Sequence, residues 1–350
     1  MSGGVGSRFW PFSKEDKPKQ FLDFFGTGRS LLQTTFDRFE KIIPLENIFV
    51  VTNDSYAGIT RAQLPKLSES QILLEPIRRN TAPAIAYASF HILSKNPDAN
   101  IVVAPSDHLI LKEDVFLKEI ERGLRFVEEN PFLLTLGITP SRPETGYGYI
   151  QESEEQVGGI SKVKTFTEKP NLDLAKVFYE SGEFVWNSGI FLWNVKTIIN
   201  SFKQYLPDIV NKFSEGMEYF NTPKEKEFID RAFPFCPNIS IDYGILEKAD
   251  NVYVIGSDFG WSDLGTWGAL YEVADKDDNN NASFNCKALY FESNENVVTM
   301  SDNKLVVLQG LEGYIVAESE NSLLICKKED EQRIKQFVTE VKFRFGDEYV

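Results

Sequence analysis

The sequence predicts an α/β fold with a mixed, mostly parallel sheet and helices on both faces, followed by a small C-terminal β-domain. Two observations lead to this prediction. Between residues 31 and 274, short apolar runs alternate with stretches of helical periodicity, which is typical of strands joined by crossover helices. Beyond residue 285 the apolar runs become short and closely spaced, as in a small, β-helix-like domain.

Composition limits the classes of function. A chain of 350 residues with 42% hydrophobic and 25% charged residues can bury a sizeable core. The net charge of −15 argues against a nucleic-acid partner. The three cysteines form no C-x-x-C pair, so we expect neither a disulfide framework nor a zinc ribbon, and a cytoplasmic location fits. The sequence has no signal peptide and no apolar run long enough to cross a bilayer, so no membrane partner is expected.

The first half of the chain alternates regularly. Ser30 is expected to cap a helix that carries Leu31, Leu32, Phe36 and Phe39 at helical spacing. Strands are predicted at 47–52, 72–74, 101–104 and 132–138, and further helices at 56–67, 81–94 and 113–129. The polar motifs fall where strands end, and this is where ligands bind in open α/β sheets.

The second half is more mixed. Strands are predicted at 147–151, 160–166, 184–193 and 251–256, and helices at 171–181, 195–205, 223–232, 240–248 and 263–274. We expect one domain over residues 1–274, a turn-rich linker at 275–284 and a small β-domain over 285–350 that ends in an amphipathic helix. That helix, at about 329–343, either caps the β-domain or meets a second subunit.

A glycine-rich run opens the chain. Gly3, Gly4 and Gly6 let the backbone turn sharply, so that its N–H groups can converge on phosphate oxygens. Arg8 and Lys19 bracket the run with two cations suited to phosphate. Neither a dinucleotide fingerprint nor a kinase-type P-loop fits the spacing.

Two aspartates are candidate ligands for a hard cation. Asp107 follows a buried strand and a Pro-Ser turn, and Asp263 lies in the segment Gly260–Trp267. Carboxylates at such positions can hold Mg²⁺, which shares its shell with phosphates. The competing interpretation is that Asp107 caps the next helix and that Ser262 or Asp263 is an N-cap. With only two histidines in the chain, a histidine-based metal site or catalytic triad is not expected.

Further polar motifs interrupt the apolar pattern. Asn80 and Thr81 stand at a predicted helix start, where they could be simple caps. Glu168 and Lys169 precede a proline, a sequence that is also common in surface turns, and Asn187 lies inside an otherwise apolar strand. Such violations of a strand pattern tend to be functional or bulged sites.

Together these segments resemble the sugar-nucleotide pyrophosphorylases, a family of nucleotidyltransferases. The shared motifs are G-G-x-G-x-R followed by P-K, and the string Glu75–Ala84, which resembles E-P-x-x-R-N-T-A-P-A of the guanylyltransferase branch. The resemblance covers most of residues 2–270 in the expected order and is weak over the C-terminal part.

The resemblance implies transfer of GMP from GTP to α-D-mannose 1-phosphate, giving GDP-mannose and pyrophosphate, with Mg²⁺ as cofactor. It implies catalytic roles for Arg8 and Lys19, and metal ligation by Asp107 and Asp263. The implied nucleotide contacts are Gly3, Gly4, Gly6, Asn80, Thr81 and Ser106, and the implied sugar-phosphate contacts are Gly146, Glu168, Lys169 and Asn187. Asp242, in a further family-like segment, is expected to be structural.

Two other functions stay open. A related nucleotidyltransferase could use another base or sugar, and some proteins keep this fold as non-catalytic interaction subunits. Arg8, Lys19, Asp107 and Asp263 are all present, which argues against the second. A homodimer is possible, and we expect no phosphomannose isomerase activity.

The start of the chain departs from the family pattern. In the family, the glycine loop follows an apolar strand at the centre of the sheet, whereas here Met1 already adjoins the loop. We therefore expect the first strand to be missing and the native chain to extend before Met1.

Overall fold

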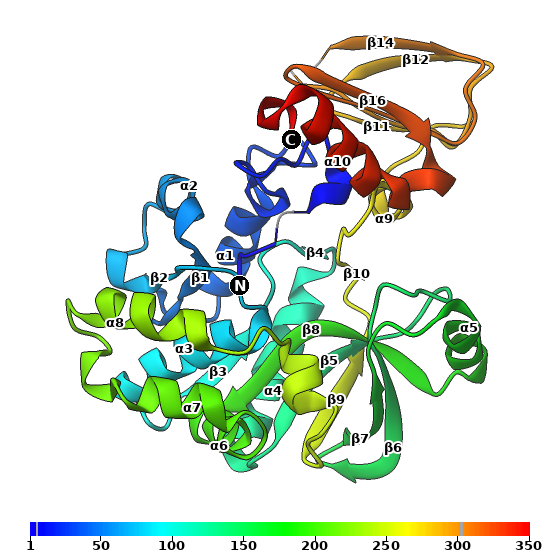
Figure 1. The fold of residues 1–350 in the computed structure, drawn as a ribbon. Coiled ribbons are helices and arrows are strands. Elements are labelled where there is room, and N and C mark those ends of the chain that lie inside the picture. The colour runs from blue at the N-terminus through cyan, green and yellow to red at the C-terminus, as the bar shows by residue number, and fades with distance from the viewer. Residues whose placement is uncertain (5, 302–303) are drawn as a thin grey trace.

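The computed structural model describes residues 1–4, 6–301 and 304–350, which form an α/β body followed by a stack of short strands (Figure 1). The helices are α1 Leu31–Glu40, α2 Ala57–Gln63, α3 Thr81–Lys95, α4 Glu113–Glu129, α5 Leu172–Ser181, α6 Val195–Tyr205, α7 Pro207–Ser214, α8 Glu225–Ala232, α9 Trp267–Val273 and α10 Ile334–Phe345. The strands of the body are β1 Val50–Asn53, β2 Ile72–Glu75, β3 Asn100–Val103, β4 Leu109–Ile110, β5 Leu133–Ile138, β6 Tyr149–Val157, β7 Ile160–Thr167, β8 Phe184–Asn194, β9 Val252–Ser257 and β10 Trp261–Ser262.

Most of the predicted elements are present. The predicted N-cap Ser30 accepts a hydrogen bond from the Gln33 N–H, in a full capping box at the start of α1. Helix α7 was not predicted. The helix predicted at 240–248 contains instead a π-helical turn, Asp242–Leu246.

The main sheet is mixed, as predicted. The expectation that most neighbouring strands run parallel is wrong, because most of the described pairs in this sheet are antiparallel. Its order is β3-β8-β5-β9-β7-β6, and β1 and β2 form a separate parallel pair. Only β5 and β9 are parallel neighbours among the described pairs of this sheet. The long strand β8 lies between β3 and β5 and runs antiparallel to both, so that β3 and β5 keep one direction without touching.

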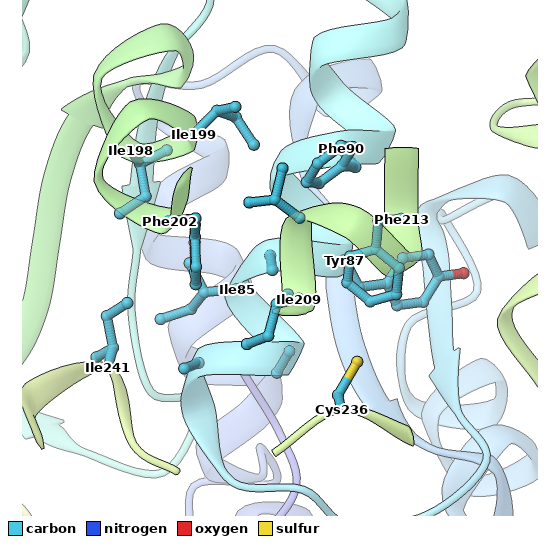
Figure 2. Packing of buried hydrophobic residues seen from close by; sticks show 14 of the residues in the cluster. Ile85, Tyr87, Phe90, Ile198, Ile199, Phe202, Ile209, Phe213, Cys236 and Ile241 are labelled. Carbon is cyan, nitrogen blue, oxygen red and sulfur yellow. The ribbon is translucent and has the colours of Figure 1, made fainter. Parts of the chain in front are cut away.

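Helices cover both faces of this sheet, as predicted, and alternate residues of β8 show it. Phe191 and Trp193 belong to a core with α3, α6 and α7, whereas Ile190 and Leu192 belong to a second core with α4. Because successive side chains of a strand point to opposite faces, the two cores lie on opposite sides. Figure 2 shows the first core, in which Ile85 of α3 lies among side chains of the neighbouring helices.

The N-terminal residues lie between β1 and β3. The Ser2 N–H donates to the Val51 carbonyl at 2.8 Å, and the Ser106 N–H donates to the Met1 carbonyl at 3.0 Å. Behind Met1 is a cavity of about 370 Å³ between the facing edges of the two strands, lined by apolar side chains of β1, β3, α1 and α3. We call this cavity the β1–β3 slot. No strand of the described residues fills it.

The C-terminal domain is β-helix-like. Its strands are β11 Ala282–Phe284, β12 Lys287–Phe291, β13 Val297–Thr299, β14 Leu305–Gln309, β15 Tyr314–Ser319 and β16 Ser322–Lys327. Strands β11, β13 and β15 pair in parallel as successive layers, and β12 pairs in parallel with β14. The last residues of the segment predicted as a linker, 282–284, thus belong to this domain.

Helix α10 lies against the N-terminal segment (Figure 1). Its first residue, Ile334, is fully buried in one core with Phe9 and Trp267. Of the two alternatives for this helix, packing within the chain is therefore observed. Within the described residues, no helix is long and apolar enough to cross a membrane.

Candidate active site

Lys19 lies where three segments meet. Its ammonium Nζ is 2.9 Å from Asp107 Oδ2 and donates to the backbone carbonyls of Asp263 at 2.6 Å and Leu264 at 3.2 Å. An ammonium has three N–H donors, and these three oxygens use all of them. Lys19 therefore joins the loop after β3 to the turn after β10.

The glycine run turns tightly over Lys19. Gly6 has φ of 68°, and a Cβ built there would lie 2.6 Å from Lys19 Cβ. Any larger residue would be strained and would also displace Lys19. Gly3 lies beside the Glu75 carboxylate, since a Cβ there would be 3.7 Å from Glu75 Oε2, and Gly4 faces open space. Arg8 follows in a short 3₁₀ turn, Ser7–Phe9.

Asp107 contacts Lys19 through its carboxylate, and Asp263 contacts it through its backbone carbonyl. Burial raises the pKa of the Asp107 carboxyl, but the Lys19 and His108 charges outweigh it and hold that pKa below its usual range. Asp263 Oδ1 accepts hydrogen bonds from the Tyr147 hydroxyl at 2.7 Å and the Gly265 N–H at 2.8 Å. The competing interpretation, in which Ser262 or Asp263 is an N-cap, is wrong, because α9 begins later and Thr266 caps it.

The two carboxylates suit a cation that phosphates also ligate. Among the described residues, no group of three His, Cys, Asp or Glu side chains converges as a closed metal site. Mg²⁺ does not need one, since it usually takes one or two carboxylates and completes its shell with water and phosphate oxygens. The residues present thus fit Mg²⁺ better than a structural Zn²⁺.

The predicted nucleotide contacts lie around the start of α3 and beside Met1. Asn80, at φ 67°, caps α3 by accepting from the Thr81 N–H, so its capping interpretation is observed. The Thr81 hydroxyl accepts from the Ile241 N–H at 2.8 Å and so ties this helix start to the segment before Asp242. Ser106 is buried, and its hydroxyl has no hydrogen-bond partner among the described residues.

Glu75 is a buried carboxyl that was not among the predicted site residues. It is 6% exposed, and burial raises its pKa to about 7, against the opposing charge of the Met1 ammonium. Its Oε1 has no partner within the described part of the chain. The charge was visible in the sequence, but its burial next to Gly3 was not.

The predicted sugar-phosphate residues lie before the start of β6, after the end of β7 and within β8. Gly148, rather than the predicted Gly146, makes the close approach, since a Cβ there would be 2.5 Å from Glu168 Oε2. The Gly146 N–H instead donates to Glu144 Oε1 at 2.9 Å. Lys169 pairs with Glu168 at 2.7 Å and has φ of 47°, a backbone conformation that is unusual for lysine.

Asn187 connects this group to Asp242. Its Nδ2 donates to Asp242 Oδ1 at 2.9 Å, and its Oδ1 accepts from the Thr135 hydroxyl at 3.1 Å. Burial, followed by the Glu168 charge, raises the pKa of Asp242 to about 6. Asp242 was expected to be structural, but it faces the predicted sugar site. The sequence signal was the family-like segment around it.

Aromatic side chains link the two halves of the site. The Tyr147 ring lies 5.1 Å from the rings of both Trp186 and Trp261, and the Trp261 N–H donates to His108 Nδ1 at 3.1 Å. Tyr147 also binds Asp263, as described above, so one side chain touches the carboxylate half and the sugar half. The structure therefore brings all the predicted motifs into one continuous region.

The chain is similar to known proteins along its whole length. Residues 1–280 match a family model described as nucleotidyl transferase, and residues 288–341 match one described as a MannoseP isomerase/GMP-like beta-helix domain. A mannose-1-phosphate guanylyltransferase of Escherichia coli is 36% identical over 349 residues, which cover 97% of this chain and 74% of that protein. The corresponding protein of Salmonella montevideo is 37% identical over 360 residues, which cover 100% of this chain and 74% of that one.

A solved structure shares the fold over both domains. It is a protein of Thermus thermophilus named mannose-1-phosphate geranyltransferase, with a TM-score of 0.89 and 28% identity over 98% of each chain. The family model spans the whole body that carries the glycine loop and the paired carboxylates. The chain therefore belongs to the nucleotidyl transferase family.

Proposed function

We propose that this enzyme transfers GMP from GTP to α-D-mannose 1-phosphate, releasing pyrophosphate and forming GDP-mannose. The observation that carries the proposal is Lys19, whose ammonium joins the glycine loop to both candidate metal-binding segments. The names of the relatives described above supply the choice of guanine and mannose.

The glycine loop and its cations would receive the triphosphate. Gly4 faces open space, which favours close approach of phosphate oxygens to the backbone there. Arg8 offers a planar fork for the β- and γ-phosphates, and Lys19 lies deeper, where we assign it to the α-phosphate. Asn80, Thr81 and Ser106 would line the nucleoside side.

The other half-site would hold the incoming sugar phosphate. Lys169 would bind its phosphate, and Glu168 and Asn187 would accept from or donate to sugar hydroxyls, with the Gly146–Gly148 backbone alongside. A phosphate oxygen of the sugar attacks the α-phosphorus in line as the bond to pyrophosphate breaks. Such a transfer depends on positioning and charge neutralisation rather than on a covalent intermediate.

Mg²⁺ would be held by Asp107 and Asp263. Bound there, it would neutralise charge on the transferring phosphate. Two observations support this assignment. The Asp107 carboxylate and the Asp263 backbone carbonyl both contact the Lys19 ammonium, and the charges of both carboxylates act on His108. Before the ion binds, the hydrogen bond from the Tyr147 hydroxyl keeps the Asp263 carboxylate oriented.

A pyrophosphate-release assay across a matrix of nucleoside triphosphates and sugar 1-phosphates tests this function. We expect release only with GTP and mannose 1-phosphate, and only with Mg²⁺ present. Faster turnover with another pair would favour the related nucleotidyltransferase. No turnover with any pair, by protein that binds nucleotide, would favour an interaction subunit.

We also propose a homodimer formed through the C-terminal domain. Four apolar side chains alternate outward on the paired strands β12 and β14, and each is more than half exposed: Leu289, Phe291, Leu305 and Val307. An exposed apolar sheet face of this kind marks an association surface. Light scattering should give a dimer mass, and Val307→Glu should give a monomer.

The three free cysteines fit the expected cytoplasmic location.

A further inference from the structure

The C-terminal domain meets the glycine loop at an apolar junction. Phe9, Trp267 and Ile334 are each fully buried there, and the Phe9 and Trp267 rings lie 5.0 Å apart. Phe9 directly follows Arg8, and Trp267 begins the helix that follows the Asp263 turn. Ile334 is the first residue of α10. Three segments far apart in the sequence therefore share one packed core.

Two polar residues that precede Ile334, Glu331 and Gln332, make hydrogen bonds to the segments that meet at this junction. Gln332 Oε1 accepts a hydrogen bond from Arg8 Nε at 3.0 Å. Its neighbour Glu331 accepts from the Gly268 N–H at 2.7 Å and also bonds the Thr266 hydroxyl, both in the first turn of α9. One dipeptide thus holds the arginine of the glycine loop and the start of α9 at the same time.

Charges of both signs surround Arg8. Lys335 is the second residue of α10, and the Arg8 charge is the main cause that lowers the pKa of its ammonium. Lys335 therefore repels Arg8, while Glu331 attracts it. The Gln332 carbonyl uses only Nε, so both terminal nitrogens of the guanidinium keep their N–H groups for a phosphate. Within the described residues, Arg8 has no other hydrogen bond.

We propose that Gln332 is a positioning residue for Arg8, anchored to α9 by Glu331, so that the C-terminal domain sets the geometry of the triphosphate site. This rests on the proposed role of Arg8 in that site. An arginine fixed in advance gives up less rotamer freedom when the triphosphate arrives, and it meets the phosphates in one orientation. Neither Gln332 nor Glu331 touches the substrate in this account.

The test compares Gln332→Ala with Gln332→Glu, which keeps an acceptor oxygen for Arg8. Glu329→Gln is the matched control, since Glu329 is exposed on the same turn and pairs only with Lys327 among the described residues. We expect Gln332→Ala to lower kcat about tenfold with no change in the melting temperature or in the KM for mannose 1-phosphate. Gln332→Glu and the control should stay near the parent protein.

An Arg8→Ala background decides whether the effect runs through Arg8. If it does, adding Gln332→Ala to Arg8→Ala changes nothing further. Additive losses, or a Gln332→Ala variant as active as the control, would overturn the proposal.

Pyrophosphate binding by calorimetry gives a readout that does not require the transfer reaction. We expect Gln332→Ala and Arg8→Ala to weaken it to the same extent. If the parent protein binds pyrophosphate in this Gln332-dependent way yet turns over no sugar phosphate, the proposed function fails while the positioning role stands. Unchanged pyrophosphate affinity in Gln332→Ala would refute the positioning role alone.

Discussion

Filling the β1–β3 slot should stabilise the protein. We predict that roughly six to eight apolar residues added before Met1, a usual strand length, will enter the slot. The hydrogen bonds of Met1 and Ser2 already follow the pattern of a parallel strand between β1 and β3. A chain extended backward from Met1 would continue between the same two edges. It should be apolar on both faces, because strands inside such sheets are buried on both sides.

One part of the gain in stability comes from the Met1 ammonium. Burial lowers its pKa from 8.0 to about 6, against the attraction of Asp107 and Glu75. That difference corresponds to roughly 2–3 kcal/mol of unfavourable free energy in the folded state, and converting the amine to an amide removes it. Filling the cavity and pairing the strand edges add to this, less the cost of ordering the new residues. For a chain of 350 residues, removing the ammonium penalty alone should raise the melting temperature by about 3–4 °C at pH 6.

The pH dependence has a definite sign. Because the folded pKa lies below the unfolded value, the unfolded chain binds more protons between pH 6 and 8. The stability of the chain that starts at Met1 therefore rises with pH across this window. The advantage of the extended protein should shrink over the same range, leaving only the contribution of strand packing above pH 8.

Melts followed by circular dichroism at pH 6 and pH 8, together with GTP-dependent turnover, would test this. The control is an extension of equal length built from Gly, Ser and Lys, which removes the free amine but cannot pack in the slot. We expect the chain from Met1 to be poorly soluble or nearly inactive, and the apolar extension to restore a cooperative melt and GTP-dependent turnover. If the chain from Met1 melts as cooperatively and turns over as fast as the extended form, the reasoning is wrong.

Three further predictions concern the site. Asp107→Asn and Asp263→Asn should each cut turnover by orders of magnitude with an unchanged circular dichroism spectrum, because metal charge is worth several kcal/mol at a transferring phosphate. If either variant shows near-normal turnover when Mg²⁺ is varied, the aspartate replaced in it is not a metal ligand. Lys169→Ala should raise the KM for sugar phosphate far more than that for GTP, and equal weakening toward both substrates would contradict its assignment to one half-site. Asp242→Asn should abolish an inflection near pH 6 in the pH profile of kcat/KM for sugar phosphate. The pKa of Asp242 is raised from 3.8 to about 6 in the folded protein. The stability of the protein should therefore fall as the pH rises from about 4 to about 6. Thermal melts of Asp242→Asn should not show this fall in stability.

Local signals in the sequence predicted most elements, and they failed where distant contacts decide. Helix α4 occupies the predicted range 113–129, since its apolar periodicity is strong throughout. The start of α9 was misplaced because Ser262 and Asp263 look like caps, whereas Thr266 takes that position. The antiparallel direction of β8 between β3 and β5 cannot be predicted from the residues of β8 either. A run buried on both faces reads the same in either direction.

The same limit applies to the site. Each motif was visible from its residue types, but the contact between Arg8 and Gln332 joins positions 324 apart, and no local pattern marks it. Burial of Glu75 and Asp242 is likewise a property of the assembled fold. Their raised pKa values follow from desolvation, which a sequence motif does not reveal.

The contacts of Lys19 suggest how the site changes when substrate arrives. All three ammonium donors are used, two of them by backbone carbonyls that cannot leave without moving the Asp263 turn. Only Asp107, whose side chain is 26% exposed, is free to rotate away. Binding of a cation by Asp107 would therefore release one Lys19 N–H for the α-phosphate. An amide at position 107 could still accept from Lys19 and preserve the fold, but it lacks the charge that attracts the cation. For this reason Asp107→Asn separates catalysis from folding, whereas substitution of Lys19 would disturb both.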